Sequence, residues 1–398
     1  HSPRYAYGPP SASGMMDGGP ALTRQGLRAV PSLMYLERQP NFSIGPDESE
    51  NENAGIAASA LRAVGATRSR KTAQSTAQSA RNLVPQGGLF WDGRADTLQS
   101  QAFAPLLNPA EMDAGSIDRV AVTLKRAPYA PQLRRLFGAA IDRQPRLLVA
   151  EALFAVARFE FEDASFHPYT SKFDYWLEGK ARLSPAESRG YALFNDQHGA
   201  DCAACHVDRV GADRLPPLLT DHQFEALAAP RNRALIADRD DRFFDLGLCG
   251  PVRSDLRTLT RYCGMFATPT LRNVALRHAF FHNGVYRSLR QVLEFYNFRA
   301  VDPARVYPRT SGGVLAIDDD LPVRYRANVD VSDPPFDRAR AARPPMSARD
   351  EDDIIAFLRT LTDGYALAPP ARDAPRSAGD GRASSRAGLR RAASRSRR

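Results

Sequence analysis

Two cysteines and a histidine stand together in the segment DCAACH, at Cys202, Cys205 and His206. The C-x-x-C-H spacing is typical of covalent haem attachment. The chemistry needs two thiols one helical turn apart, each adding to a haem vinyl group, and an adjacent histidine that meets the iron. A thioredoxin-like redox pair would need a βαβ setting, and a zinc site would need another Cys/His pair at ligand spacing. The motif therefore predicts one covalently bound haem c.

The other face of this haem needs either a ligand or an open site. The downstream candidates are Met265, His278, His282 and Tyr296. A methionine ligand raises the reduction potential and suits electron transfer, whereas a tyrosinate favours the higher oxidation states of iron. Sequence spacing alone does not choose among them, because each could also be an ordinary core or loop residue.

The two remaining cysteines, Cys249 and Cys263, bracket a turn-rich segment. In an oxidising compartment they could close a disulfide loop worth about 3 kcal/mol. The alternative is a pair of buried free thiols.

The formal charge of +9 is concentrated at one end of the chain. Residues 366–398 hold nine arginines against Asp373 and Asp380 and so supply +7, which leaves about +2 for the rest. With so little net charge, the rest of the chain does not show the excess of basic residues that is typical of nucleic-acid-binding proteins. The tail lacks apolar residues to bury, and we predict that it is a disordered basic extension.

Hydrophobic periodicity predicts a mostly α fold. Segments 116–138 and 145–161 carry apolar residues at three- and four-residue spacing, and the longest apolar run, 147–159, is too short to span a membrane. Ser184 is placed to cap one later helix. Ser347 and Gly364 are placed to begin and end the last one.

Residues 43–86 interrupt this pattern, since they are rich in Ala, Ser, Asn and Gln and poor in large apolar residues. They predict an exposed insertion. The predicted organisation is an N-terminal domain, 1–166, that contains this insertion, a C-terminal domain, 167–365, and the tail, 366–398.

Two further segments carry a resemblance to a known family. Residues 87–112, GGLFWDGRADTLQSQAFAPLLNPAEM, and 264–296, GMFATPTLRNVALRHAFFHNGVYRSLRQVLEFY, are similar to signature segments of the bacterial di-haem cytochrome c peroxidase and MauG family. They lie in the right order around C-A-A-C-H, and the likeness extends over most of residues 1–365. The resemblance implies two cytochrome c-like domains with long loops, each holding one haem c.

Only one C-x-x-C-H motif is present, so the resemblance raises the question of the first haem. In the family, the N-terminal haem motif is followed by a segment very similar to SPRYAYGPP (2–10), so His1 resembles the last residue of that motif. No other histidine precedes His167. The resemblance thus implies that His1 binds the iron of the N-terminal haem, that its cysteine anchors lie outside this chain, and that its sixth position is open to peroxide.

The other roles are also implied by the resemblance. Trp91 matches the tryptophan that relays electrons between the haems. Gln101 and Glu111 match the polar pair over the peroxide-binding haem, with Gln101 orienting peroxide and Glu111 moving its proton. Tyr296 lies where peroxidases of the family carry a methionine ligand and MauG carries a tyrosine. This favours Tyr296 as sixth ligand of the C-terminal haem, with Met265 as the alternative.

The implied function is a periplasmic peroxidase that reduces hydrogen peroxide to water with electrons from a small donor protein, a cytochrome c or a cupredoxin. One alternative is a MauG-like oxidase that modifies a protein substrate through a ferryl haem. The other is a mono-haem electron-transfer protein. A homodimer is a possible assembly, and no nucleic acid or membrane span is expected. The family's calcium site lacks its usual residues, because Ala29, Arg277 and Ala279 occupy those positions.

Overall fold

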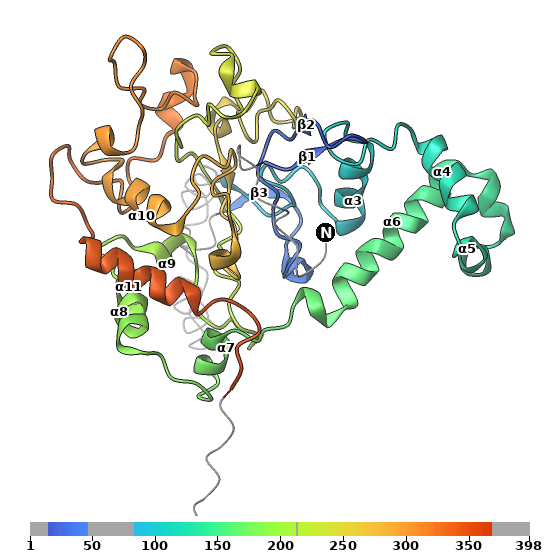
Figure 1. Ribbon diagram of the computed structural model, residues 1–398, viewed down its shortest axis with the longest axis horizontal. Coiled ribbons are helices and arrows are strands. Elements are labelled where there is room, and N and C mark those ends of the chain that lie inside the picture. The colour runs from blue at the N-terminus through green and yellow to red at the C-terminus, as the bar shows by residue number, and fades with distance from the viewer. Residues whose placement is uncertain (1–14, 47–82, 212–213, 368–398) are drawn as a thin grey trace, which may run out of the picture. The chain divides into compact units, whose positions relative to one another are not determined.

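The computed structural model describes residues 15–46, 83–211 and 214–367 (Figure 1). His1, residues 47–82 of the predicted insertion and most of the predicted tail lie outside the described residues. The chain divides into one compact unit, His1–Tyr365, and a second unit, Ala366–Arg398, at the predicted start of the tail.

Regular structure in the described residues is mainly helical, which confirms the mostly α prediction. The α-helices are α3 (Leu98–Leu107), α4 (Ile117–Arg126), α5 (Ala130–Phe137), α6 (Pro145–Glu162), α7 (Lys172–Leu177), α8 (Pro185–Phe194), α9 (Cys202–Cys205), α10 (Leu289–Phe298) and α11 (Ala348–Arg359). Long loops and short 3₁₀ turns connect them. The division into two cytochrome c-like domains stays a prediction.

Within the described residues, three small two-stranded antiparallel sheets connect the loops. The pairs are β1 (Asp17–Gly18) with β2 (Arg24–Gln25), β3 (Ser43–Pro46) with β4 (Leu83–Gln86), and β5 (Phe224–Glu225) with β6 (Phe266–Ala267). The ends of the predicted insertion are therefore paired strands, in which Ile44 lies opposite Pro85. They are ordered because Ile44 also packs against a buried cluster that contains Phe224.

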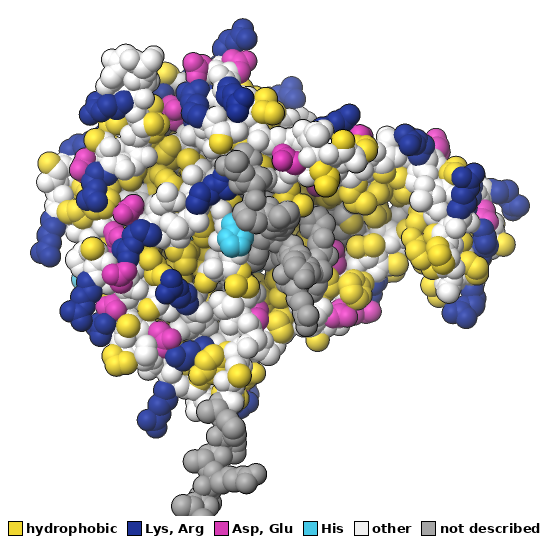
Figure 2. All heavy atoms as spheres, in the orientation of Figure 1, with side chains coloured by type: hydrophobic (Ala, Val, Ile, Leu, Met, Phe, Trp, Pro, Cys, Tyr) yellow, Lys and Arg dark blue, Asp and Glu magenta, His cyan; other side chains and the backbone are white. Residues whose placement is uncertain are grey.

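Helices α3 to α6 share one hydrophobic cluster. Its buried members include Ala121 of α4, Leu133 of α5 and Leu148 and Val149 of α6, as the three- and four-residue spacing predicts. Other apolar side chains on these helices stay exposed to solvent, Phe159 and Phe161 among them, and Figure 2 shows hydrophobic side chains on this part of the surface.

The second main cluster forms where α8 crosses α11 (Figure 1). Gly190 permits the close crossing, since a Cβ there would lie 1.9 Å from the carbonyl oxygen of Asp353. Phe194 of α8 and Phe357 of α11 are both fully buried at the contact, with ring centroids 5.2 Å apart. This helix pair forms one side of the C-terminal cavity described below.

The predicted caps are confirmed at both helix starts but not at the last helix end. Ser184 and Ser347 each accept a hydrogen bond from the third residue of α8 and α11, in complete capping boxes. Helix α11 ends at Arg359 with Thr360 as its cap, so Gly364 does not end the helix as predicted. Gly364 instead takes a left-handed turn, with φ of 86°, in the chain that leaves the helix.

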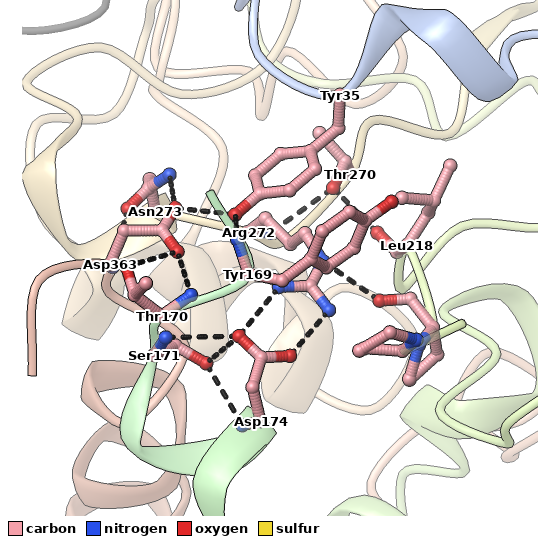
Figure 3. A network of polar contacts seen from close by, with 12 residues as sticks. Tyr35, Tyr169, Thr170, Ser171, Asp174, Leu218, Thr270, Arg272, Asn273 and Asp363 are labelled. Atoms are coloured by element: carbon pink, nitrogen blue, oxygen red, sulfur yellow. Dashed lines mark hydrogen bonds and ion pairs between the residues drawn. The ribbon is translucent and has the colours of Figure 1, made fainter. Parts of the chain in front are cut away.

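The N-terminal segment 15–46 packs largely on the C-terminal half of the chain. Tyr35, for example, is buried against Leu218, and its hydroxyl donates to Asp363 at 2.6 Å. Beneath it, the Arg272 guanidinium forms a two-pronged ion pair with Asp174, and both side chains are almost fully buried (Figure 3). Such a pair is costly to break, because removing one partner leaves an uncompensated buried charge.

Candidate haem sites

The predicted haem motif lines a large apolar cavity in the C-terminal half. Cys202 and Cys205 lie on the single turn of α9, and His206 follows directly. The remaining wall comes from α8, α10, α11 and the loops around residues 266–282 and 330–336; it includes Phe194, Leu293, Tyr296, Phe336, Met346, Ile354 and Leu358. Aliphatic and aromatic side chains around two thiols and an imidazole suit a haem attached through both thiols.

His206 is held in the form that binds iron. Its Nδ1 lies 3.0 Å from the carbonyl oxygen of Leu219, which can only accept a hydrogen bond, so Nδ1 carries the proton. Burial lowers the pKa of His206 to about 4, so the ring is neutral at ordinary pH. With Nδ1 protonated and the ring neutral, the lone pair lies on Nε2, the arrangement usual for a metal-ligating histidine.

The two thiols do not resemble a catalytic redox pair. Burial, aided by Asp201, raises the pKa of Cys202 to about 12, and burial likewise raises the pKa of Cys205. Redox-active C-x-x-C thiols have lowered pKa values. A zinc site is also unsupported, since no group of three or more His, Cys, Asp or Glu side chains in the described residues is arranged to hold a metal ion.

Of the candidates for the sixth ligand, the structure places Tyr296 and His282 on this cavity. Tyr296 is partly buried near the two cysteines, and desolvation raises its pKa. His282 Nε2 lies 3.1 Å from Asp320, and its ring stacks on Phe266, so that nitrogen is already engaged. Met265 packs instead against the cluster of Phe224 and Leu248, and His278 is exposed. The geometry thus favours Tyr296 over Met265, and Tyr296 remains a prediction.

Sequence reasoning missed Met346, a buried thioether on the same cavity wall. Its backbone pairs with the Asn297 side chain, which holds it beside α10. No local signal singles it out, because Met346 precedes the cap of α11 and reaches the cavity only through the packing of that helix.

A second, smaller cavity lies on the other side of Trp91. It is lined by residues 31–36, Gln39, 88–91, Gln101, Leu218, Thr220, His222, 267–270 and Arg277. Trp91 and Gln101 both line this cavity, and the roles predicted for them remain predictions. We call this the N-terminal cavity, because Gln101, which the resemblance assigns to the first haem, lies on its wall.

Trp91 lines both cavities. It is almost fully buried, and its indole N–H donates to the carbonyl oxygen of Ala29 at 2.7 Å. The next residue, Asp92, is completely buried and pairs with Arg28 and Arg94. These contacts fix an aromatic ring in the wall between the two sites, where an electron relay would have to lie.

Glu111 is not among the residues that line the N-terminal cavity. Its carboxylate accepts a hydrogen bond from the Asn108 side chain at 2.6 Å, close to the end of α3. The role of Glu111 remains a prediction.

Arg277 occupies one of the positions of the family's calcium site. It donates to the carbonyl oxygens of Val30 and Ala279, and it lines both cavities beside Trp91.

The predicted disulfide between Cys249 and Cys263 is confirmed. It closes a loop whose last residue is followed by Gly264, which lines the C-terminal cavity. The alternative of two buried free thiols is therefore wrong. In the described residues, only Cys202 and Cys205 are free cysteines.

Comparison with known proteins agrees with this geometry. The family model for di-haem cytochrome c peroxidase matches residues 46–182. The solved structure of the diheme peroxidase BthA from Burkholderia thailandensis is 34% identical, covers 91% of this chain and 80% of its own, and superposes with a TM-score of 0.75. The chain belongs to the di-haem cytochrome c peroxidase and MauG family.

Sequence relatives in this family carry both names. The methylamine utilization protein MauG of Paracoccus denitrificans is 33% identical over 53% of this chain and 54% of its own. The cytochrome c peroxidase Ccp of Escherichia coli is 34% identical over 69% of this chain and 45% of its own. The chain thus spans about half the length of these curated relatives. Membership implies haem c as cofactor and oxidoreductase chemistry.

None of the helices in the described part of the chain has the length and apolar character needed to cross a membrane.

Proposed function

We propose that this protein is a di-haem peroxidase that reduces hydrogen peroxide to water with electrons from a small donor protein, a cytochrome c or a cupredoxin. The observation that carries the proposal is the position of Trp91, which lines both the cavity of the C-x-x-C-H motif and the cavity of Gln101. A buried aromatic ring that lines both cavities is well placed to relay electrons between two haems.

The C-terminal cavity is the proposed electron-transfer site. Cys202 and Cys205 would hold the haem through thioether bonds, and His206 Nε2 and Tyr296 would bind its iron. The haem would supply an iron that accepts and releases single electrons. The chain's own residues keep His206 in the right tautomer and surround the site with apolar side chains, which exclude water and so tune the potential.

The N-terminal cavity is the proposed peroxide site. His1 would bind the iron, Gln101 would orient the peroxide, and Glu111 would move a proton between its oxygens, as the family resemblance implies. Gln101 is buried on the cavity wall and can donate and accept hydrogen bonds there. Breaking the O–O bond to water needs a proton on the departing oxygen, so an acid–base group is required.

The test uses the two tryptophans of the chain. Trp91→Phe in the haem-loaded protein is expected to lower steady-state peroxide consumption at least tenfold with reduced donor. Trp176→Phe is the matched control, since Trp176 packs in the core against Phe173 and Tyr191 and lines neither cavity. Equal rates for Trp91→Phe and the wild type would overturn the relay, and a wild type that consumes no peroxide would overturn the function.

A second candidate is MauG-like oxidation of a partner protein. The placement of Tyr296, rather than Met265, on the C-terminal cavity favours it, because a tyrosinate stabilises oxidised iron. Tyr296→Met is expected to raise the reduction potential of the C-terminal haem; an unchanged potential would exclude Tyr296 as a ligand and remove this support.

We place the protein in the periplasm. Support comes from the disulfide Cys249–Cys263, because structural disulfides persist in oxidising compartments.

A further inference from the structure

Charged side chains are distributed unevenly over the wall of the C-terminal cavity. Among the described residues that line this cavity, Arg277 is the one lysine or arginine. The wall also carries several carboxylates, which are Asp201, Glu225, Asp245, Asp320, Asp330 and Asp333. A haem has a pair of propionate side chains, which are anions at ordinary pH. The charges on the wall therefore restrict where a propionate can lie.

Carboxylates act on both thiols of the haem motif. Burial raises the pKa of Cys202 to about 12, and the charge of Asp201 adds to this effect. Burial also raises the pKa of Cys205, with further contributions from carboxylates that include Glu225 and Asp333. The same negative charges repel another anion, so they disfavour a propionate beside the thiols.

The acidic residues on another part of the wall already have partners. Both oxygens of Asp245 accept hydrogen bonds at 2.7 Å from the Arg28 guanidinium, which also pairs with Asp92. Asp320 lies 3.1 Å from His282 Nε2. These pairs are connected to the segment 28–30, since Ala29 N–H donates to the carbonyl oxygen of His282.

The same segment holds Arg277. Its Nη2 donates to the carbonyl oxygen of Val30 at 3.2 Å, and its Nε donates to that of Ala279 at 3.3 Å. Its own N–H donates to the carbonyl oxygen of Val274 at 3.1 Å, at the end of the 3₁₀ turn Val274–Leu276. A guanidinium has five N–H donors, and its two carbonyl contacts use two of them. Carbonyl oxygens orient the guanidinium without adding a full negative charge.

The chemistry of haem attachment brings the propionates to the opposite side of the cavity from the thiols. In a haem, the vinyl groups that react with thiols and the propionates lie on opposite edges of the ring. A haem attached through Cys202 and Cys205 therefore directs its propionates away from α9. A guanidinium is suited to receive one, because it binds a carboxylate through two parallel hydrogen bonds.

We propose that Arg277 binds a propionate of the C-terminal haem, and that its charge fixes the orientation of this haem and raises its reduction potential. The potential rises because a nearby positive charge favours the ferrous state, which carries one positive charge fewer than the ferric state. Since Trp91 and Arg277 line the same two cavities, the propionate edge of the haem would face the proposed electron relay.

This inference rests on the haem proposed for the C-terminal cavity and is independent of peroxide reduction. The direct test is a crystal structure of the haem-loaded protein. We expect guanidinium nitrogens of Arg277 at about 2.7–2.9 Å from propionate oxygens, the usual length of a charge-assisted hydrogen bond. Propionates that contact only solvent or other side chains would overturn the proposal.

The second test measures the reduction potential by spectroelectrochemical titration. Arg277→Met is expected to shift the equilibrium of the C-terminal haem about tenfold toward the ferric state, which lowers the potential of a one-electron couple by about 59 mV. The transition of this haem is identified as the one that disappears when Cys202 and Cys205 are both replaced by alanine. An unchanged potential in Arg277→Met would overturn the electrostatic role.

Matched variants separate charge from structure. Arg277→Lys keeps the charge but loses the two-pronged geometry, so it should keep most of the potential. Arg309→Met is the control, because Arg309 is exposed and lines neither cavity. Its potential should equal that of the wild type. Equal falls in Arg277→Met and Arg277→Lys would show that the charge does not set the potential and would overturn its role.

The outcomes also distinguish this proposal from the proposed function. A wild type in which Arg277 binds a propionate, but which consumes no peroxide, would leave this inference intact and overturn the peroxidase. An active peroxidase whose potential does not respond to Arg277→Met would do the reverse. A wild type without haem on Cys202 and Cys205, as measured by intact mass, would overturn both.

Discussion

The two cavities are built from the chain in different ways. In the C-terminal cavity, both thiols and the proposed proximal ligand lie within five consecutive residues, 202–206, on one turn of helix and its cap. In the N-terminal cavity, Gln39, Gln101 and His222 come from three distant segments. The comparison teaches that a site with a local motif can be recognised from sequence, whereas a site assembled by packing cannot.

The cavities nevertheless share one wall. Trp91, residues 267–270 and Arg277 line both of them. The segment 28–30 braces this wall, since it receives hydrogen bonds from Trp91 and Arg277 and is bonded through Ala29 N–H to the carbonyl of His282. Changes near the wall are therefore expected to affect both sites, and changes far from it only one.

The largest expected effect is on the local motif. Replacement of both Cys202 and Cys205 by alanine is expected to abolish covalent haem attachment in the C-terminal cavity, because no other free cysteine lies in the described residues. Intact mass spectrometry would show the loss of one haem. An unchanged mass would mean that this motif does not attach haem.

The next largest expected effect is a loss of stability when the buried ion pair of Asp174 and Arg272 is broken. Asp174→Ala should lower the free energy of unfolding by about 3–5 kcal/mol, because it leaves the buried Arg272 guanidinium without its counter-charge. Denaturant unfolding measures this. Asp352→Ala is the control, since Asp352 pairs with Arg290 at the exposed surface and should cost about 0–1 kcal/mol. Similar losses in the two variants would contradict the expectation that the buried ion pair contributes more to stability than the exposed one.

The disulfide beside the C-terminal cavity should matter somewhat less. Replacing Cys249 and Cys263 by serine is expected to lower the free energy of unfolding by about 3 kcal/mol, through the greater chain entropy of the unfolded state. Denaturant unfolding of the wild type under reducing conditions should show the same loss. A stable reduced protein would show that packing alone holds this loop.

The pH dependence tests the neutral state of His222. Its pKa is about 4 in the folded protein and 6.5 in the unfolded chain, so between these values the unfolded chain binds more protons and acid favours unfolding. Lowering the pH from 7 to 5 should therefore cost about 2 kcal/mol through this residue.

Denaturant unfolding at both pH values measures this loss, and His222→Gln should reduce it by that amount. His198→Gln should not. Equal acid sensitivity of His222→Gln and the wild type would show that His222 is protonated in the folded protein.

The smallest effect concerns the helices that frame the C-terminal cavity. Ser347→Ala removes the cap of α11 and should cost about 1 kcal/mol, with a similar loss for Ser184→Ala at α8. Thermal unfolding would register both. A loss in only one variant would indicate that the two helices do not contribute equally.

Much of the fold could be predicted because its signals are local. The spacing of apolar residues predicted α4, α5 and α6, and hydrogen-bonding side chains marked the starts of α8 and α11. The prediction that Gly364 ends α11 was wrong. The helix ends at Arg359, and Gly364 forms a left-handed turn beyond it. Glycine marks a left-handed turn in sequence without saying which element it follows.

By itself, the sequence determined the haem motif, the family resemblance and a pair of cysteines that could close a loop, since each depends on residue types at short spacing. Only the tertiary structure decided that Tyr296 reaches the C-terminal cavity while Met265 does not, that Glu111 lies off the N-terminal cavity, and that His222 lies on it. The physical reason is that a side chain's direction and its hydrogen-bond partners are set by packing between distant segments. Such contacts, like that between Gln39 and His222, leave no periodic or local trace in the chain.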